Sequence, residues 1–166
     1  MSDLFEALAI LHRHGVRFVV VGAFAAVAQG YPLPTEDVDI TPARDPENME
    51  RLVSALTELE AKLRLPRDDA VEFPLEPELI ANARLWTLAT KAGDLDLVFE
   101  PAGTRGYEDV RRDAIEQTLR GTPVRLASLR DIIRMKEASN RPKDQAQVPA
   151  LRQTLEVVRE RERLDL

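Results

Sequence analysis

The chain has 166 residues, of which 23 are Lys or Arg, 29 are Asp or Glu, two are His and none is Cys. With 44% hydrophobic and 31% charged residues, its composition excludes a disordered chain, a collagen-like repeat or a coiled coil as a description of the whole. The lack of Cys excludes disulfides, thiol nucleophiles and Cys-ligated metal sites, and it fits a cytoplasmic protein. The net charge of −6 argues against non-specific coating of nucleic acid.

Charge is divided unevenly along the chain. Residues 1–100 carry nine basic and 18 acidic side chains, whereas residues 101–166 carry 14 and 11. The acidic half could hold a metal ion and the basic half could meet phosphate, although two differently solvated surfaces would explain the same asymmetry. The longest uncharged stretch, Phe18–Thr35, is interrupted by Gly and Pro and is not expected to span a membrane.

The first hundred residues alternate between helical and extended patterns. Leucines at helical spacing, short β-branched runs and Gly or Pro punctuation define the elements. In chain order we expect a helix over 2–14 capped by Ser2 or Asp3, a strand over 17–21, a helix over 23–29, a strand over 37–40, a helix from Asp45 to about Arg64, and strands over 84–90 and 94–99 joined by a hairpin at 91–93.

The remaining residues are expected to be mainly helical. The pattern predicts helices over 107–119, from Ser128 to about Ala138 and over 145–163, with a short extended piece at 124–126. Pro149 should kink the last helix or mark its first turn. The sequence therefore predicts an α/β protein. A small mixed sheet flanked by helices forms the core over 1–100, and a helical extension over 101–166 packs on it as one compact unit.

Several familiar sites are not indicated. His12 and His14 lie two residues apart in a helix and so point in different directions, which disfavours a shared metal. Gly22 lacks the glycine spacing of a P-loop or a dinucleotide fingerprint. No Ser/His/acid combination has a recognisable local signature.

Acidic residues alternate along two of the expected strands. Asp37 and Asp39 lie two apart in an extended segment, so both project from one face, about 7 Å apart. Asp94 and Asp96 repeat the pattern. If the two strands are neighbours, three carboxylates converge and form a ligand set for one or two magnesium ions. The alternative is that these acids form the wet face of their strands.

A glycine follows the first strand directly and opens the next helix. At such a turn, Gly22 would let backbone N–H groups and the positive helix terminus approach a phosphate. The alternative role is a small residue required for packing of helix on strand.

Taken together, these motifs resemble the nucleotidyltransferase superfamily that includes DNA polymerase beta, and within it the small bacterial members related to abortive-infection and toxin–antitoxin systems. Their signature is a strand, Gly-Gly or Gly-Ser opening a helix, Asp-x-Asp, and a third Asp on a later strand. The matching segments here are Gly22-Ala23, Thr35-Glu36-Asp37-Val38-Asp39-Ile40, Asp96, the helical segment Leu129–Lys136 and Arg141-Pro142-Lys143-Asp144.

The resemblance implies a magnesium-dependent enzyme that moves a nucleoside monophosphate from an NTP onto a hydroxyl acceptor. Asp37, Asp39 and Asp96 would be catalytic residues and would hold Mg²⁺, two ions in the full arrangement, with Asp96 activating the acceptor hydroxyl. The residues that would bind the nucleotide are Gly22, Ala23, Thr35 and Lys136, with Arg141 and Lys143 as further candidates. The chain departs from the family pattern at Ala23, the second small residue of the turn, and at Leu33, where many relatives carry Arg.

Other functions stay open at this point. The acceptor could be RNA, protein or a small molecule, and a cognate partner protein or a homodimer could complete the recognition surface. The alternative to an enzyme is a catalytically degenerate nucleotidyltransferase fold that acts as a binding or regulatory module, for example in a toxin–antitoxin or phage-defence pair. A metal-dependent phosphohydrolase is less favoured because its usual His-Asp clusters are lacking.

Overall fold

The computed structural model describes residues 3–67 and 69–165. Within them, seven strands form one sheet, which is mixed because β2 runs parallel to β5 and β1 parallel to β7, while the other neighbours are antiparallel. This confirms the predicted α/β class. Across the sheet the order is β3 (Lys62–Leu63), β4 (Leu85–Thr90), β5 (Gly93–Val98), β2 (Asp37–Pro42), β1 (Phe18–Val21), β7 (Thr122–Leu126) and β6 (Ile115–Leu119).

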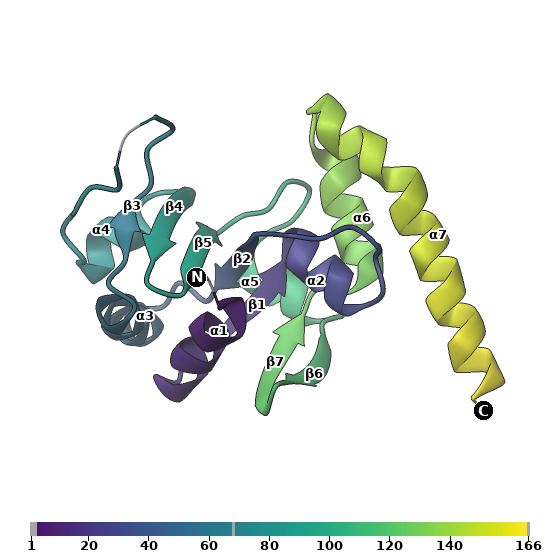
Figure 1. Ribbon diagram of the computed structural model, residues 1–166, viewed down its shortest axis with the longest axis horizontal. Coiled ribbons are helices and arrows are strands. Elements are labelled where there is room, and N and C mark those ends of the chain that lie inside the picture. The colour runs from purple at the N-terminus through teal and green to yellow at the C-terminus, as the bar shows by residue number, and fades with distance from the viewer. Residues whose placement is uncertain (1–2, 68, 166) are drawn as a thin grey trace.

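The longer helices gather in two groups around the sheet (Figure 1). Two of them, α1 and α3, pack against each other on one side, while α6 and α7 form a pair beside the short helix α2. The helices are α1 (Leu4–Arg13), α2 (Gly22–Ala28), α3 (Pro46–Glu58), α4 (Pro77–Ala81), α5 (Tyr107–Arg111), α6 (Leu129–Ala138) and α7 (Pro142–Leu164).

Buried and partly buried residues alternate along the central strands β2 and β5. In β2, Val38 and Ile40 are fully buried whereas the residues between them are only partly buried. Leu95 and Leu97 repeat this in β5. Because side chains alternate across a strand, the apolar residues pack into the core and the acidic ones are left together on the other face.

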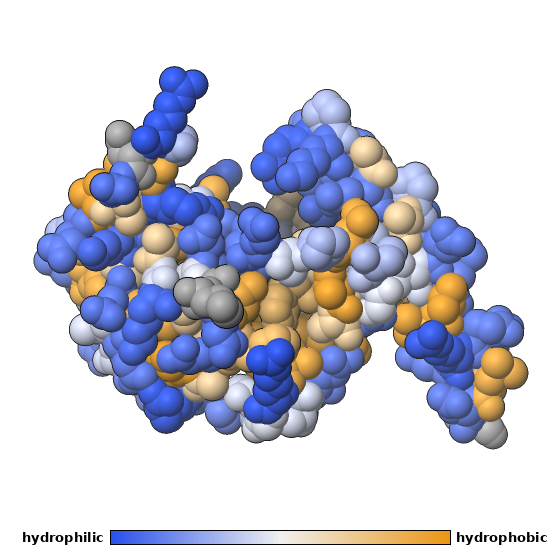
Figure 2. Space-filling view, viewed as in Figure 1, coloured by the Kyte–Doolittle hydropathy of each residue, from blue (hydrophilic) through white to orange (hydrophobic). Residues whose placement is uncertain are grey.

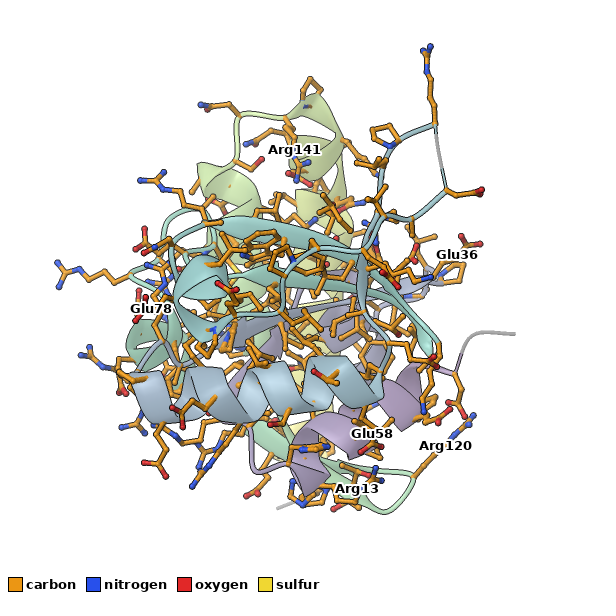
Figure 3. All side chains as sticks on the ribbon, turned by 90° about the vertical axis from the view of Figure 1, so that its left-hand side faces the viewer. Arg13, Glu36, Glu58, Glu78, Arg120 and Arg141 are labelled. Atoms are coloured by element: carbon orange, nitrogen blue, oxygen red, sulfur yellow. The ribbon has the colours of Figure 1, made fainter. Side chains whose placement is uncertain are left out.

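The α1–α3 layer is joined by polar contacts as well as by apolar packing. Asp3 caps α1 by accepting from the backbone N–H of Phe5, as the sequence predicts for one of its two candidate caps, while Ser2 lies outside the described residues. At the other end of α1, Arg13 forms an ion pair with Glu58 of α3, and both are labelled in Figure 3. Helix α1 of this layer packs against β5 and β7 of the sheet.

The prediction of a helix over 107–119 is wrong. Helix α5 ends at Arg111, and β6 and β7 instead form a hairpin whose turn is the pair Arg120 and Gly121. Both turn residues have positive φ, 48° and 85°, which is the geometry of the two-residue turn that matches strand twist. The hairpin joins the sheet through β7 and β1, so the sheet draws on both sides of the expected boundary at residue 100.

Smaller differences concern where elements begin and end. Helix α3 ends at Glu58 rather than near Arg64, because the chain turns at Glu60, which has a φ of 54°, and enters β3. Helix α7 begins at Pro142 and runs through Pro149. The short elements β3 and α4 were not predicted at all. Among the described residues, no helix has both the length and the apolar character needed to cross a membrane.

Candidate active site

The pairing of β2 with β5 gathers the acidic residues. The parallel register places Asp37 beside Asp94 and Asp39 beside Asp96. Carboxylate oxygens of Asp37, Asp39 and Asp96 all lie within 4.8 Å of one another. The condition that the sequence left open is therefore met: the two strands are neighbours, and the three candidate acids converge.

Gly22 lies directly against this cluster. It has a φ of +69°, which favours glycine, and it is the first residue of α2, directly after β1. A Cβ atom at this position would collide with the carboxylate of Asp39. The strand-to-helix glycine thus allows Asp39 to sit against the backbone at the start of α2, with Ala23 as the next residue of the helix.

The crowding of the acids changes their protonation. Burial, together with the negative charges of Asp37 and Asp96, raises the pKa of Asp39 to about 7, although the charge of Lys136 opposes the rise. Burial also raises the pKa of Asp96, while the nearby Arg64 guanidinium works in the opposite direction. Near neutral pH the cluster therefore retains a proton that a bound cation would displace.

Arg64 binds the third acid of the cluster. Its Nη2 donates to Asp96 Oδ1 at 3.0 Å, and its Nη1 lies 3.5 Å from Asp94 Oδ2. The same guanidinium donates to the Leu88 carbonyl at 3.1 Å, and the Arg64 backbone N–H donates to the Thr87 carbonyl at 2.9 Å. Arg64 is thus held at the end of β3, where its guanidinium bridges Asp94 and Asp96.

Thr35 supports the first acid. Its hydroxyl lies 3.1 Å from the Asp37 carbonyl and 3.3 Å from Asp37 Oδ1, so it orients that carboxylate. Leu33, where the resemblance leads one to expect Arg, is half exposed.

Lys136 is placed by a buried carboxylate at the α6–α7 junction. Its Nζ lies 3.0 Å from Asp144 Oδ1, while Ser139 and Arg141 hold the other oxygen of Asp144. Burial acts to raise the pKa of Asp144, but these hydrogen bonds and charges outweigh it and hold the pKa below its ordinary value. Lys136 is also near enough for its charge to lower the pKa of Asp39.

The predicted site residues thus separate into groups. One group surrounds the carboxylate cluster directly, and another lies at the α6–α7 junction or on its surface. The first comprises Asp37, Asp39, Asp96, Gly22 and Thr35, with Ala23 following Gly22; the second comprises Lys136, Arg141 and the exposed Lys143. Arg64 was missed, because in the sequence it reads as the last residue of a long helix and carries no signal of contact with residue 96.

The cluster fits a hard divalent cation. Carboxylate oxygens are the ligands that Mg²⁺ prefers, and the three carboxylates are close enough to share one or two ions. The raised pKa of Asp39 is consistent with this, because burial and the charges of Asp37 and Asp96 disfavour its ionised form, which a bound cation would stabilise. The residues present therefore fit the magnesium expected from the sequence.

Comparison with known proteins defines the fold. No model of a protein family and no curated protein matches the sequence. Among solved structures, the chain is similar to the lincosamide antibiotic adenylyltransferase LnuA in its lincomycin-bound form, with a TM-score of 0.57 and 14% identity over 90% of this chain and 94% of that one. It is also similar to ANT(2")-Ia in complex with adenylyl-2"-tobramycin, with a TM-score of 0.55 and 15% identity over 98% of this chain and 95% of that one.

The fold is therefore that of nucleotidyltransferases, as the sequence resemblance implied. At these identities the likeness shows the fold, and the chemistry has to be argued from the residues of this chain.

Proposed function

We propose that this chain is a magnesium-dependent nucleotidyltransferase that moves a nucleoside monophosphate from an NTP onto a hydroxyl acceptor. The observation that carries the proposal is the cluster of Asp37, Asp39 and Asp96 beside Gly22, within a nucleotidyltransferase fold. Clustered, partly buried carboxylates oppose folding unless their negative charge is neutralised, and a bound cation would neutralise it. We take ATP as the donor, because both similar proteins are described with adenylyl transfer or an adenylylated product.

In this proposal Asp37 and Asp39 hold Mg²⁺ together with Asp96. Bound there, the ion neutralises the triphosphate and lowers the pKa of an acceptor hydroxyl. Thr35 keeps the Asp37 carboxylate oriented toward the cluster. The absence of a side chain at Gly22 makes room for the Asp39 carboxylate beside the β1–α2 turn, so that the metal-binding acid and the backbone N–H groups at the start of α2 would face the phosphates together.

The transfer itself needs one bond formed and one broken. The acceptor oxygen attacks the α-phosphorus of the NTP, and the bond from that phosphorus to the bridging oxygen of the β-phosphate breaks. Asp96 accepts the hydroxyl proton, and pyrophosphate leaves with the electron pair of the broken bond. Lys136, held by Asp144, offsets the charge of the leaving pyrophosphate. Positioning and electrostatics then supply most of the rate enhancement.

The cellular setting is proposed on the sequence resemblance. The match of Thr35–Ile40 and of the Leu129–Asp144 region supports a place among the nucleotidyltransferases of abortive-infection or toxin–antitoxin systems. Such an enzyme would work in the cytoplasm, where NTPs and Mg²⁺ are available, with or without a partner protein.

The proposal is tested by calorimetric titration of each NTP into the protein, with and without Mg²⁺. We expect binding that requires Mg²⁺, is strongest for ATP, and is lost in the Asp37→Asn/Asp39→Asn double variant. A matched control replaces the exposed Asp69 by Asn, which should leave binding unchanged.

If no NTP binds under any of these conditions, the enzyme proposal fails. The chain would then be the degenerate binding or regulatory module. The departures from the family pattern at Ala23 and Leu33 would support that function.

A further inference from the structure

A large hollow lies at the end of the sheet where β2 and β5 begin. It has a volume of about 960 Å³, in the upper part of the range of roughly 300–1,000 Å³ typical of small-molecule sites. Its walls come from the start of α1, from α2, from the segment before β2, from the first residues of β5, and from the β6–β7 hairpin at its turn. Figure 2 shows hydrophobic residues gathered at the centre of the molecular face that α1 and α2 occupy in Figure 1.

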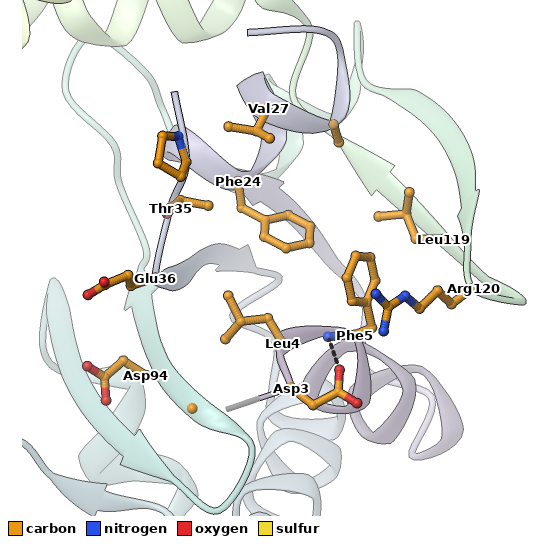
Figure 4. Close-up of a pocket in the computed structure, with 13 residues that line it drawn as sticks. Asp3, Leu4, Phe5, Phe24, Val27, Thr35, Glu36, Asp94, Leu119 and Arg120 are labelled. Carbon is orange, nitrogen blue, oxygen red and sulfur yellow. Dashed lines mark hydrogen bonds between the residues drawn. The ribbon is translucent and has the colours of Figure 1, made fainter. Parts of the chain in front are cut away.

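The floor of this hollow is aromatic and aliphatic. Phe5 and Phe24 meet edge to face with their ring centroids 5.7 Å apart, and both rings project into the hollow in Figure 4. Leu4, Val27 and Leu119 complete the apolar lining. Such a surface favours the body of an apolar or aromatic molecule.

One end of the hollow touches the proposed active site. Thr35 lines it and also binds the Asp37 carboxylate through its hydroxyl. Asp94 lines it as well, and Arg64 connects Asp94 to Asp96. A molecule that fills the hollow would thus have its end beside the carboxylates that the transfer reaction uses.

The charges around the rim limit what can enter. Glu36 and Asp94 lie on the side of the hollow away from Arg120 in Figure 4. Among the described residues, Glu36 forms no ion pair and no side-chain hydrogen bond, so its charge is available at this rim. Arg120 is the cation at the opposite wall, where its guanidinium covers the Phe5 ring at 4.0 Å. Because Asp94 is paired with Arg64, the carboxylate of Glu36 is the charge that would repel a phosphate group carried by the acceptor itself.

We infer that this hollow, which we call the Phe5–Phe24 pocket, binds the acceptor, and that the acceptor is a small alcohol with an apolar or aromatic body and no phosphate near its hydroxyl. This rests on the proposed function, since it assigns the acceptor of that same reaction. It selects a small molecule among the acceptors that the sequence left open, because an RNA end would bring phosphates against the carboxylate of Glu36. The hydroxyl would lie toward Thr35 and the apolar body over the two rings.

The test uses a matched pair of fluorescent probes, 2-(2-naphthyl)ethanol and its phosphate monoester, titrated into the full chain. We expect the alcohol to bind at least tenfold more tightly than the phosphate. Ala28→Trp, which fills the pocket from α2, should weaken binding of the alcohol at least tenfold. Ala81→Trp places the same bulk on α4, at a separate hollow between α3 and α4, and should leave binding unchanged.

A second variant covers the case in which Ala28→Trp does not fold. Glu36→Lys changes an exposed rim residue and should reverse the preference, so that the phosphate binds more tightly than the alcohol. With ATP and Mg²⁺ present, pyrophosphate release in the presence of the alcohol should fall at least tenfold in Ala28→Trp while ATP affinity is unchanged.

The inference is overturned if the alcohol does not bind to the native chain, if Ala28→Trp and Ala81→Trp affect it equally, or if the phosphate binds more tightly without the Glu36 change. These outcomes are distinguishable from failure of the proposed function, which appears as loss of Mg²⁺-dependent ATP binding in the native chain. Alcohol binding without ATP binding would overturn the acceptor role.

Discussion

At the scale of single residues, the site is defined by charges that oppose one another. Among the three acids of the cluster, Asp39 has the most strongly raised pKa, because it is mostly buried between Asp37 and Asp96 and lies against Gly22. Its pKa of about 7 means that the folded protein keeps a proton on Asp39 over a pH range in which the unfolded chain would release it. In metal-free buffer, the stability of the fold should therefore fall as the pH rises from about 4 to 7.

Replacing Asp39 by Asn should raise the melting temperature in metal-free buffer at pH 8, because the buried charge is removed. The rise corresponds to about 2–4 °C for each kcal/mol recovered in a chain of this size. At pH 4 the difference should disappear, since Asp39 is then neutral in the native protein. Thermal melts of both proteins with chelator and with Mg²⁺ check this, and Mg²⁺ should stabilise the native chain only. A lower melting temperature of the variant at pH 8 without metal would contradict it.

A second prediction concerns the residue that was not foreseen. Arg64 works to lower the pKa of Asp96, so Arg64→Gln should raise it and move the acidic limb of the kcat–pH profile to higher pH. The profile is measured at saturating Mg²⁺ and ATP, with Arg67→Gln, an exposed neighbour in the following loop, as the control. If the acidic limb stays at the same pH or moves to lower pH, Arg64 does not lower the pKa of Asp96.

At the scale of elements, the junction of α6 and α7 positions Lys136, whose charge acts on Asp39 of the cluster. Asp144 is 4% exposed and receives contacts from Lys136, Ser139 and Arg141. These bonds join the end of α6 to the first turn of α7. The junction therefore orients Lys136 and at the same time holds the two helices together.

Asp144→Asn should destabilise the protein by about 1.5–3 kcal/mol at pH 7, the usual range for a hydrogen bond to a charged group. The pKa of Asp144 is lowered in the folded state, so its contribution is present above the ordinary carboxyl pKa and is lost as the pH falls through the lower folded value. Denaturant unfolding at pH 7 and at strongly acid pH checks this, and the difference between the proteins should shrink in acid. An equal difference at both pH values would show that loss of packing, rather than of charge, is responsible.

At the scale of the whole molecule, stability is concentrated in the sheet and its α1–α3 layer. The buried side chains of α7 all lie within its first part, the last of them being Thr154. Beyond it, Val157 and Leu164 are 49% and 77% exposed, and the helix extends away from the sheet in Figure 1. The outer part of α7 thus has few contacts to hold it.

Amide hydrogen exchange should reveal this difference. Backbone amides of residues 156–164 are expected to exchange at least about a hundredfold faster than those of β2 and β5, because local opening there breaks few buried contacts. Mass spectrometry of peptides from both regions measures the ratio. Equally slow exchange at the two places would mean that a second copy or a partner covers the outer part of α7 in solution.

Much of the site could be predicted because its signals are local. Alternation of Asp37 and Asp39 with buried β-branched residues identifies both the strand and its polar face. Gly22 after a run of valines marks the turn into α2, and Asp96 repeats the alternation on a later strand. Hydrophobic periodicity depends only on residues close together in the sequence, so it can be recognised without knowledge of the fold. The hairpin of β6 and β7 was missed because residues 115–119 were assigned to a helix over 107–119, although 124–126 was expected to be extended.

The sequence by itself determined the strands that carry the acids, the glycine between β1 and α2, and the α/β class, since each follows from local pattern and backbone sterics. Only the tertiary structure decided that β2 and β5 pair in parallel with Asp39 beside Asp96, that Arg64 reaches Asp96 from β3, and that separate turns enclose the Phe5–Phe24 pocket. Those features join residues far apart in the chain, and their register and burial depend on packing of the whole core rather than on any single segment.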